Sequence, residues 1–119
     1  MNMNLDEVNS ILYLKPEKAL STEDFLQISS VLDSYFKDRA QLKGLVIETR
    51  NFPGWENFNA FIAHVKFIRK HNARIQRIAL VTDSKFADFA KSFIGLFVTS
   101  EIKHFYYDQA SAATKWILQ

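Results

Sequence analysis

The chain has 119 residues, and it contains no cysteine, only three glycines and only two prolines. The absence of cysteine excludes catalytic thiols, disulfides, iron–sulfur clusters and thiolate zinc sites, and it fits a reducing cytoplasm. Three glycines are too few for a glycine-rich phosphate-binding loop. Disordered and low-complexity chains are enriched in glycine and proline, so the scarcity of both residues favours a folded domain.

Long apolar runs and strong net charge are also missing. No stretch approaches the roughly 18 apolar residues of a membrane span, and the N-terminus lacks the basic and apolar regions of a signal peptide. The net charge of +2 is too small for a general nucleic-acid binder, whose affinity depends on many phosphate contacts. We therefore expect a cytoplasmic protein with no nucleic-acid partner.

Acidic residues are absent between Glu56 and Asp83, where the chain carries five bases. They are Lys66, Arg69, Lys70, Arg74 and Arg77. A basic run of this kind is usually a solvated helix face. The alternative is a surface that meets anionic lipid.

Phenylalanine is abundant: there are eleven, together with two tryptophans and four tyrosines. A chain of this length can bury a sufficient core without a metal or a disulfide. We predict one domain over residues 1–119 with an aromatic-rich core.

Apolar patterns predict how strands and helices alternate. Strands are expected over residues 8–14, 44–49, 77–82 and 102–107, and residues 2–5 are expected to form a hairpin with the first of these. Helices are expected from Ser21 or Thr22 to about residue 39, over 57–71, from Asp83 or Ser84 to 97, and after Asp108. Strands separated by helices need crossover connections, so the order predicts an α/β fold with a largely parallel or mixed sheet.

Ligands of open α/β sheets bind beyond the carboxyl ends of the strands. The strand over 44–49 leads into an aromatic loop, and the strand over 77–82 leads into an acidic residue. The expected helix after each of them has a phenylalanine near its start. The predicted ligand-binding residues are Arg50, Phe52, Trp55, Phe58, Asp83 and Phe86. In the plainer interpretation, Trp55 is a hydrophobic staple for the second helix and Asp83 is a helix cap.

A second candidate surface surrounds Gly95. The apolar residues there are too many for one buried helical stripe, so part of the segment is expected to be exposed or to form a lid over a pocket. Combined with the basic run, this predicts a contact surface for an anionic membrane or a protein partner, formed by Phe93, Ile94, Leu96, Phe97, Lys66, Arg69 and Lys70.

No catalytic or metal site is predicted. His64 and His71 lie seven residues apart on one helix, about 10 Å along its axis, and cannot share a metal. His104, flanked by aromatic residues in a strand, is interpreted as structural. No cofactor is expected.

The acidic residues have simple structural explanations. Glu48 lies in an apolar strand, and an ion pair with Arg50 is the simplest way to accommodate its charge. Asp83 and Asp108 each precede an expected helix, where capping explains them. A hydrolase or transferase that uses Glu48 or Asp83 is a third hypothesis.

Three segments together resemble the SpoIIAA-like family of small bacterial proteins related to STAS domains. They are residues 55–71 (WENFNAFIAHVKFIRKH), 75–83 (IQRIALVTD) and 104–118 (HFYYDQASAATKWIL). The resemblance implies a sandwich of a four- or five-stranded sheet with four to five helices, distantly similar to CRAL-TRIO lipid carriers. It also implies binding of lipid or a small ligand and association with a membrane.

One segment departs from the pattern of anti-sigma-factor antagonists, which carry a phosphorylatable serine after the central strand. Here residues 48–53 read ETRNFP, and Thr49 supplies the one hydroxyl. Phosphorylation acts by placing negative charge at a helix start, and an aromatic–proline loop is not suited to this.

These observations favour a non-enzymatic domain that binds a lipid or small apolar molecule and associates peripherally with the inner membrane face. In this hypothesis the helices over 57–71 and 85–97 move apart to admit the ligand. The alternative is a protein-interaction or homodimerising module that uses the apolar segment 93–98.

Overall fold

The computed structural model describes residues 1–84 and 100–119, except for the side chains of Phe58 and Phe61. Its centre is a five-stranded sheet in the order β1-β2-β3-β4-β5. The strands are β1 (Asn2–Asp6), β2 (Ile11–Lys15), β3 (Leu42–Glu48), β4 (Ile75–Val81) and β5 (Glu101–Phe105). β1 is antiparallel to β2, whereas the other neighbours are parallel.

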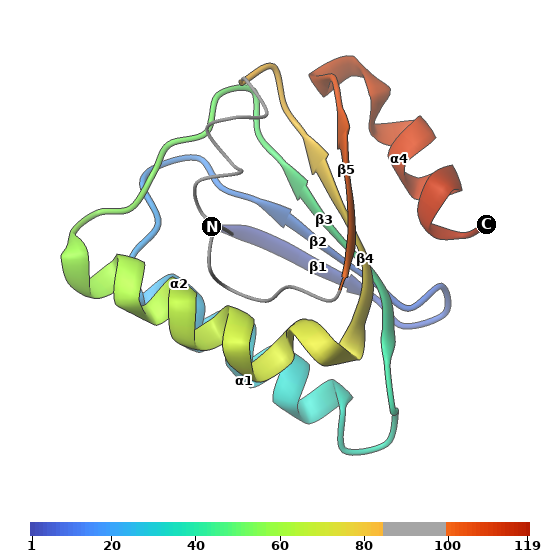
Figure 1. Ribbon diagram of the computed structural model, residues 1–119, viewed down its shortest axis with the longest axis horizontal. Helices are drawn as coiled ribbons and strands as arrows, with labels where there is room; N and C mark the ends of the chain where they lie inside the picture. Colours follow the sequence, from blue (N-terminus) through green and yellow to red (C-terminus); the bar gives the residue numbers. More distant parts are fainter. Residues whose placement is uncertain (85–99) are drawn as a thin grey trace.

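Helices cover both faces of this sheet. α1 (Thr22–Tyr35) and α2 (Phe58–His71) lie together on one face, and α4 (Ala110–Ile117) lies on the other (Figure 1). Two short 3₁₀ turns, η1 (Asn72–Arg74) and η2 (Tyr107–Gln109), precede β4 and α4. The prediction of a mixed, mostly parallel α/β sheet is confirmed. The described residues contain three α-helices, fewer than the four to five that the resemblance implied, and the predicted helix over 85–97 lies outside them.

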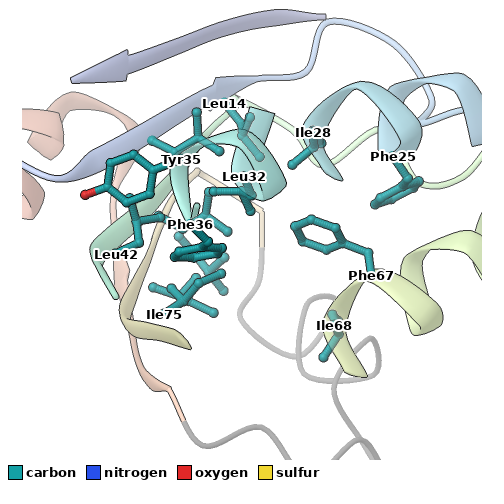
Figure 2. Packing of buried hydrophobic residues seen from close by; sticks show 14 residues of the cluster. Leu14, Phe25, Ile28, Leu32, Tyr35, Phe36, Leu42, Phe67, Ile68 and Ile75 are labelled. Atoms are coloured by element: carbon teal, nitrogen blue, oxygen red, sulfur yellow. The ribbon is translucent and has the colours of Figure 1, made fainter. Parts of the chain in front are cut away.

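The two faces of the sheet have separate cores. Under α1 and α2, side chains such as Leu32, Phe36 and Phe67 converge on the sheet (Figure 2). Under α4, Trp116 and Ile117 pack on β3, β4 and β5. Because β3 and β4 are covered on both sides, both read as continuous apolar runs in the sequence.

The first predicted strand begins too early. Residues 8–10 form the hairpin turn, and β2 starts at Ile11. The carboxylate of Asp6 accepts hydrogen bonds from the backbone and side chain of Asn9, at 3.0 and 2.9 Å, and closes the turn. Val8 is 93% exposed at its tip. A β-branched residue thus lies outside the strand because local polar bonds decide the turn.

The predicted start of the first helix is confirmed. Ser21 caps α1 in a capping box with Asp24, through hydrogen bonds of 3.1 and 2.9 Å. The helix ends at Tyr35, several residues before the predicted end. Arg74 binds the chain beyond it, donating to the carbonyl oxygens of Phe36, Arg39 and Ala40.

Asp108 is not the cap of the last helix. It lies inside η2, and α4 begins at Ala110 after Gln109, which makes no side-chain cap. The chain first turns through η2, where the side chain of Gln109 accepts from the backbone N–H of Tyr106 at 3.0 Å. That tight turn displaces Asp108 from the helix start.

No helix in the described part of the chain is long and apolar enough to cross a membrane.

Candidate functional site

An apolar cavity of about 70 Å³ lies between the sheet and the layer formed by α1 and α2. Its described lining comes from both helices, from β2, β3 and β4, and from three connecting segments. The lining residues are Met1, Leu14, Pro16, Leu20, Phe25, Ile28, Leu45, Ile47, Phe52, His64, Phe67, Ile68, His71, Asn72, Ile75 and Ile78. Most of these side chains are hydrocarbon or aromatic, as is usual for small-molecule sites.

The cavity has two unlike walls. On the sheet side the residues are aliphatic, for example Leu45, Ile47 and Ile78. The helices contribute Ile28 and Ile68 together with most of the rings of the lining. We define these rings as the aromatic wall: Phe25, Phe52, His64, Phe67 and His71. Phe25 comes from α1, the two histidines and Phe67 from α2, and Phe52 from the loop after β3.

The rings of the aromatic wall contact one another in series. Phe25 lies 5.5 Å from His64 and 6.1 Å from Phe67, measured between ring centroids. Phe67 lies 4.6 Å from His71. Trp55 extends the series behind the wall, at 5.2 Å from His64 and 5.4 Å from Phe52. These separations and the tilted or edge-on angles are those of favourable aromatic pairs.

The loop that carries Phe52 and Trp55 is held at both ends by hydrogen bonds of its backbone groups. The N–H of Phe52 donates to the Ser84 hydroxyl at 2.7 Å. Further along, the N–H of Leu20 donates to the carbonyl of Gly54 at 2.8 Å, and the N–H of Glu56 donates to the carbonyl of Leu20 at 2.7 Å. Gly54 has φ +77°, a conformation that glycine adopts without strain.

A charged cluster beside the cavity joins α1 to α2. Asp33 accepts from Lys70 at 2.9 Å, and its other carboxylate oxygen lies 3.1 Å from Nε2 of His71, which is only 2% exposed. The hydrogen bond from Lys70 and, after it, the contact with His71 lower the pKa of Asp33 below its ordinary value of 3.8. Asp33 therefore remains ionised over the physiological pH range.

A separate polar pocket of about 440 Å³ lies at the carboxyl end of the sheet. Arg50 lies 3.4 Å from the carboxylate of Asp83, and its guanidinium lies 4.6 Å from the centroid of the Tyr107 ring. Asp83 also accepts from the backbone N–H of Tyr107 at 3.2 Å. Because Asp83 already neutralises Arg50, the pocket offers little charge for an anionic ligand.

The predicted ligand-binding residues thus divide between two places. Phe52 lines the cavity and Trp55 packs behind it, whereas Arg50 and Asp83 meet in the polar pocket. Phe86 and the side chain of Phe58 lie outside the described residues. The predicted pairing of Glu48 with Arg50 is wrong: Glu48 pairs with Lys15 across the parallel strands at 3.4 Å, because the chain leaves β3 before Arg50.

Most of the basic run has structural partners. Lys70 pairs with Asp33, Arg74 binds the carbonyl groups after α1, and Arg77 pairs with Glu101 at 3.2 Å and donates to the carbonyl of Trp116. Lys66 and Arg69 are exposed on α2. The predicted contact residues Phe93, Ile94, Leu96 and Phe97 lie outside the described residues.

Sequence reasoning missed the two histidines on α2 as cavity residues. His64, Phe67, Ile68 and His71 follow the i, i+3, i+4, i+7 spacing of one helix face, which is the signal that places them together. His104, which was interpreted as structural, has its Nε2 2.8 Å from the carbonyl oxygen of Thr82.

Comparison with known proteins identifies the fold and the family. The model of the SpoIIAA-like family matches residues 11–118. The chain belongs to the SpoIIAA-like family. Its structure is similar to the crystal structure of an uncharacterized protein from the DUF3478 family, with a SpoIIAA-like fold, from Shewanella loihica PV-4. The TM-score is 0.75 at 20% identity, over 98% of this chain and 90% of that one. No curated protein matches the sequence.

One feature separates this SpoIIAA-like chain from a phosphorylation switch. Thr49, the one hydroxyl in the segment after the central strand, is 7% exposed. Its hydroxyl donates to the carbonyl of Asn51 at 3.0 Å. A buried and hydrogen-bonded hydroxyl is a poor acceptor for a phosphoryl group. This agrees with the departure of residues 48–53 from the pattern of anti-sigma-factor antagonists.

Proposed function

We propose that this SpoIIAA-like chain binds one small apolar or amphipathic molecule in the cavity between the sheet and the α1–α2 layer. The observation that carries the proposal is the composition of the cavity wall. Its described lining holds aliphatic side chains, the thioether of Met1, five aromatic rings of which two are imidazoles, and one amide, and no carboxylate, hydroxyl, lysine or arginine. Such a wall recognises shape and apolar surface.

The proposed role is binding rather than catalysis. The acids considered as catalytic candidates, Glu48 and Asp83, are engaged with Lys15 and Arg50 away from the cavity wall. The cavity of about 70 Å³ is smaller than the engineered apolar cavities of about 150 Å³ that bind benzene. Ligand entry therefore requires side chains or helices around the cavity to move.

Titration of the isotope-labelled protein with benzyl alcohol and 1-hexanol tests the proposal. We expect saturable shifts in the amide resonances of residues that line the cavity. The variant Ile47→Phe adds a ring inside the cavity and should weaken binding about tenfold. Leu26→Phe adds the same group at a site that is 61% exposed on α1, and should leave binding unchanged. An absence of saturable shifts with both alcohols would refute the proposal.

Peripheral membrane contact is the second part of the proposal. Lys66 and Arg69 are exposed on α2, and each basic residue near an anionic surface contributes about 1 kcal/mol of attraction. Two such residues give weak binding, so the apolar residues of segment 93–98 must contribute as well. A homodimer formed through that segment is the alternative, and sedimentation analysis distinguishes the two.

A further inference from the structure

The difference between the two walls of the cavity narrows the chemical class of its ligand. A saturated chain gains contact area equally from both walls. A flat aromatic ring gains in addition from edge-to-face and offset contacts with the rings of the aromatic wall. Five rings of the described lining lie on that side, and four of them are fixed on helices. The aromatic wall therefore favours planar aromatic ligands over saturated ligands of equal size.

Phe52 differs from the other members of the aromatic wall. It lies on the loop after β3, and it is half-buried, whereas Phe25, Phe67 and His71 are buried on α1 and α2. The backbone on either side of it is held by the Ser84 and Leu20 hydrogen bonds. Rotation about χ1 would move its ring while these bonds hold the loop backbone in place.

The small size of the cavity is the reason why a side chain must move before a ring can bind. About 70 Å³ is less than the cavities of about 150 Å³ that bind benzene, so a ligand ring needs additional space, which the place of the Phe52 ring would supply. A ring in that place would contact Trp55, which now lies edge-on to Phe52 with 5.4 Å between centroids. The ligand would thus replace an aromatic contact that the protein already makes.

We propose that the ligand is a planar aromatic molecule whose ring takes the place of the Phe52 side chain against Trp55. This inference rests on the proposed function, because it assumes that the cavity is a binding site. It adds the ligand class and the residue that must move.

The experiment compares benzyl alcohol with cyclohexylmethanol, which have the same number of carbon atoms and the same hydroxyl group. We expect the wild-type chain to bind benzyl alcohol at least about fivefold more tightly. Bound benzyl alcohol should show nuclear Overhauser contacts to the Trp55 indole, and the contact between Phe52 and Trp55 should be lost. Equal affinities, or a Phe52–Trp55 contact that persists in the complex, would overturn the inference while leaving a binding function in place.

Two variants separate displacement of a ring from simple enlargement of the cavity. Phe52→Ala removes the side chain that must move and should strengthen benzyl alcohol binding about fivefold, because no displacement is then required. Ile47→Ala enlarges the same cavity from a half-buried position on β3 and should produce a smaller gain. An equal gain in both variants would contradict the displacement of Phe52. If the wild type binds neither of these alcohols nor 1-hexanol, the proposed function itself fails.

Discussion

The Nε2 atom of His71 lies 3.1 Å from a carboxylate oxygen of Asp33, and the Nδ1 atom of the same ring lies 3.0 Å from the carbonyl oxygen of Phe67. Both partners are acceptors, so each contact is a hydrogen bond when the ring nitrogen that faces it carries a proton. The ring lines the cavity on α2, and Asp33 lies on α1. Together with the ion pair between Asp33 and Lys70, this ring links the two helices beside the candidate site.

Asp33→Asn should destabilise the protein by about 1 kcal/mol at pH 7, because it removes the negative partner of Lys70 and of a buried ring. The folded-state pKa of Asp33 is lowered, so its contribution is present above the unfolded value near 3.9 and is lost as the pH falls through the folded value. Urea unfolding at pH 7 and pH 3 should show a difference between wild type and variant that shrinks in acid. Asp38→Asn, an exposed change on the segment after α1, is the control. A difference that is the same at both pH values would contradict this account.

Gly44→Ala should destabilise the chain by about 1–3 kcal/mol, because a Cβ at this position on β3 would lie 2.6 Å from Cδ1 and 2.9 Å from Cγ1 of Ile117 on α4. Ile117→Ala should in turn relieve the clash, so the double variant should be more stable than the sum of the single effects predicts. Thermal unfolding of the four proteins measures this coupling. Additive effects would show that α4 adjusts its position without cost.

Arg74→Lys should lower stability by about 1–2 kcal/mol although it preserves the charge. The guanidinium donates to three carbonyl oxygens after α1 and stacks over the Phe36 ring, with 4.0 Å to its centroid. A lysine ammonium cannot reproduce this planar arrangement. Arg69→Lys, on the exposed side of α2, should have an effect below about 0.5 kcal/mol. Chemical denaturation distinguishes the two variants, and equal effects would contradict a structural role of the Arg74 guanidinium.

Liposome co-sedimentation tests the membrane part of the proposal. We expect low-salt binding to vesicles with anionic lipid, and weaker binding for the double variant Lys66→Glu, Arg69→Glu and for Phe93→Asp or Phe97→Asp. Lys37→Glu, an exposed charge reversal beyond α1, is the control. The membrane contact is refuted if the wild type does not bind at low salt, or if all variants bind equally.

Local sequence signals predicted much of the secondary structure. Ser21 or Thr22 as a cap, and the apolar spacing over residues 57–71, indicated the starts of α1 and α2, and in the structure Ser21 and Asn57 are the caps. The same reasoning failed at Val8 and at Asp108. There, hydrogen bonds that the side chains of Asp6 and Gln109 accept from backbone N–H groups determine the turn, and apolar patterning carries no information on such bonds.

The candidate site was predictable only in part. Phe52 and Trp55 were found because large aromatic residues on a loop at a strand end are conspicuous. Arg50 was expected to pair with Glu48 along one strand, but the partners that it meets, Asp83 and Tyr107, follow β4 and β5. Their meeting depends on the order of parallel strands, which a residue pattern does not encode.

The sequence by itself determined an α/β fold with a mostly parallel sheet, since apolar periodicity and the crossovers between strands leave few other arrangements, and the resemblance of three segments implied the SpoIIAA-like type. Only the tertiary structure decided where the basic run is neutralised and which residues surround the cavity. Lys70 and His71 find Asp33 on another helix, and Phe25, Phe52 and Phe67 come from three separate segments. Such contacts arise when helices pack on a sheet, because burial brings distant residues together and the resulting ion pairs and cavities belong to no single segment.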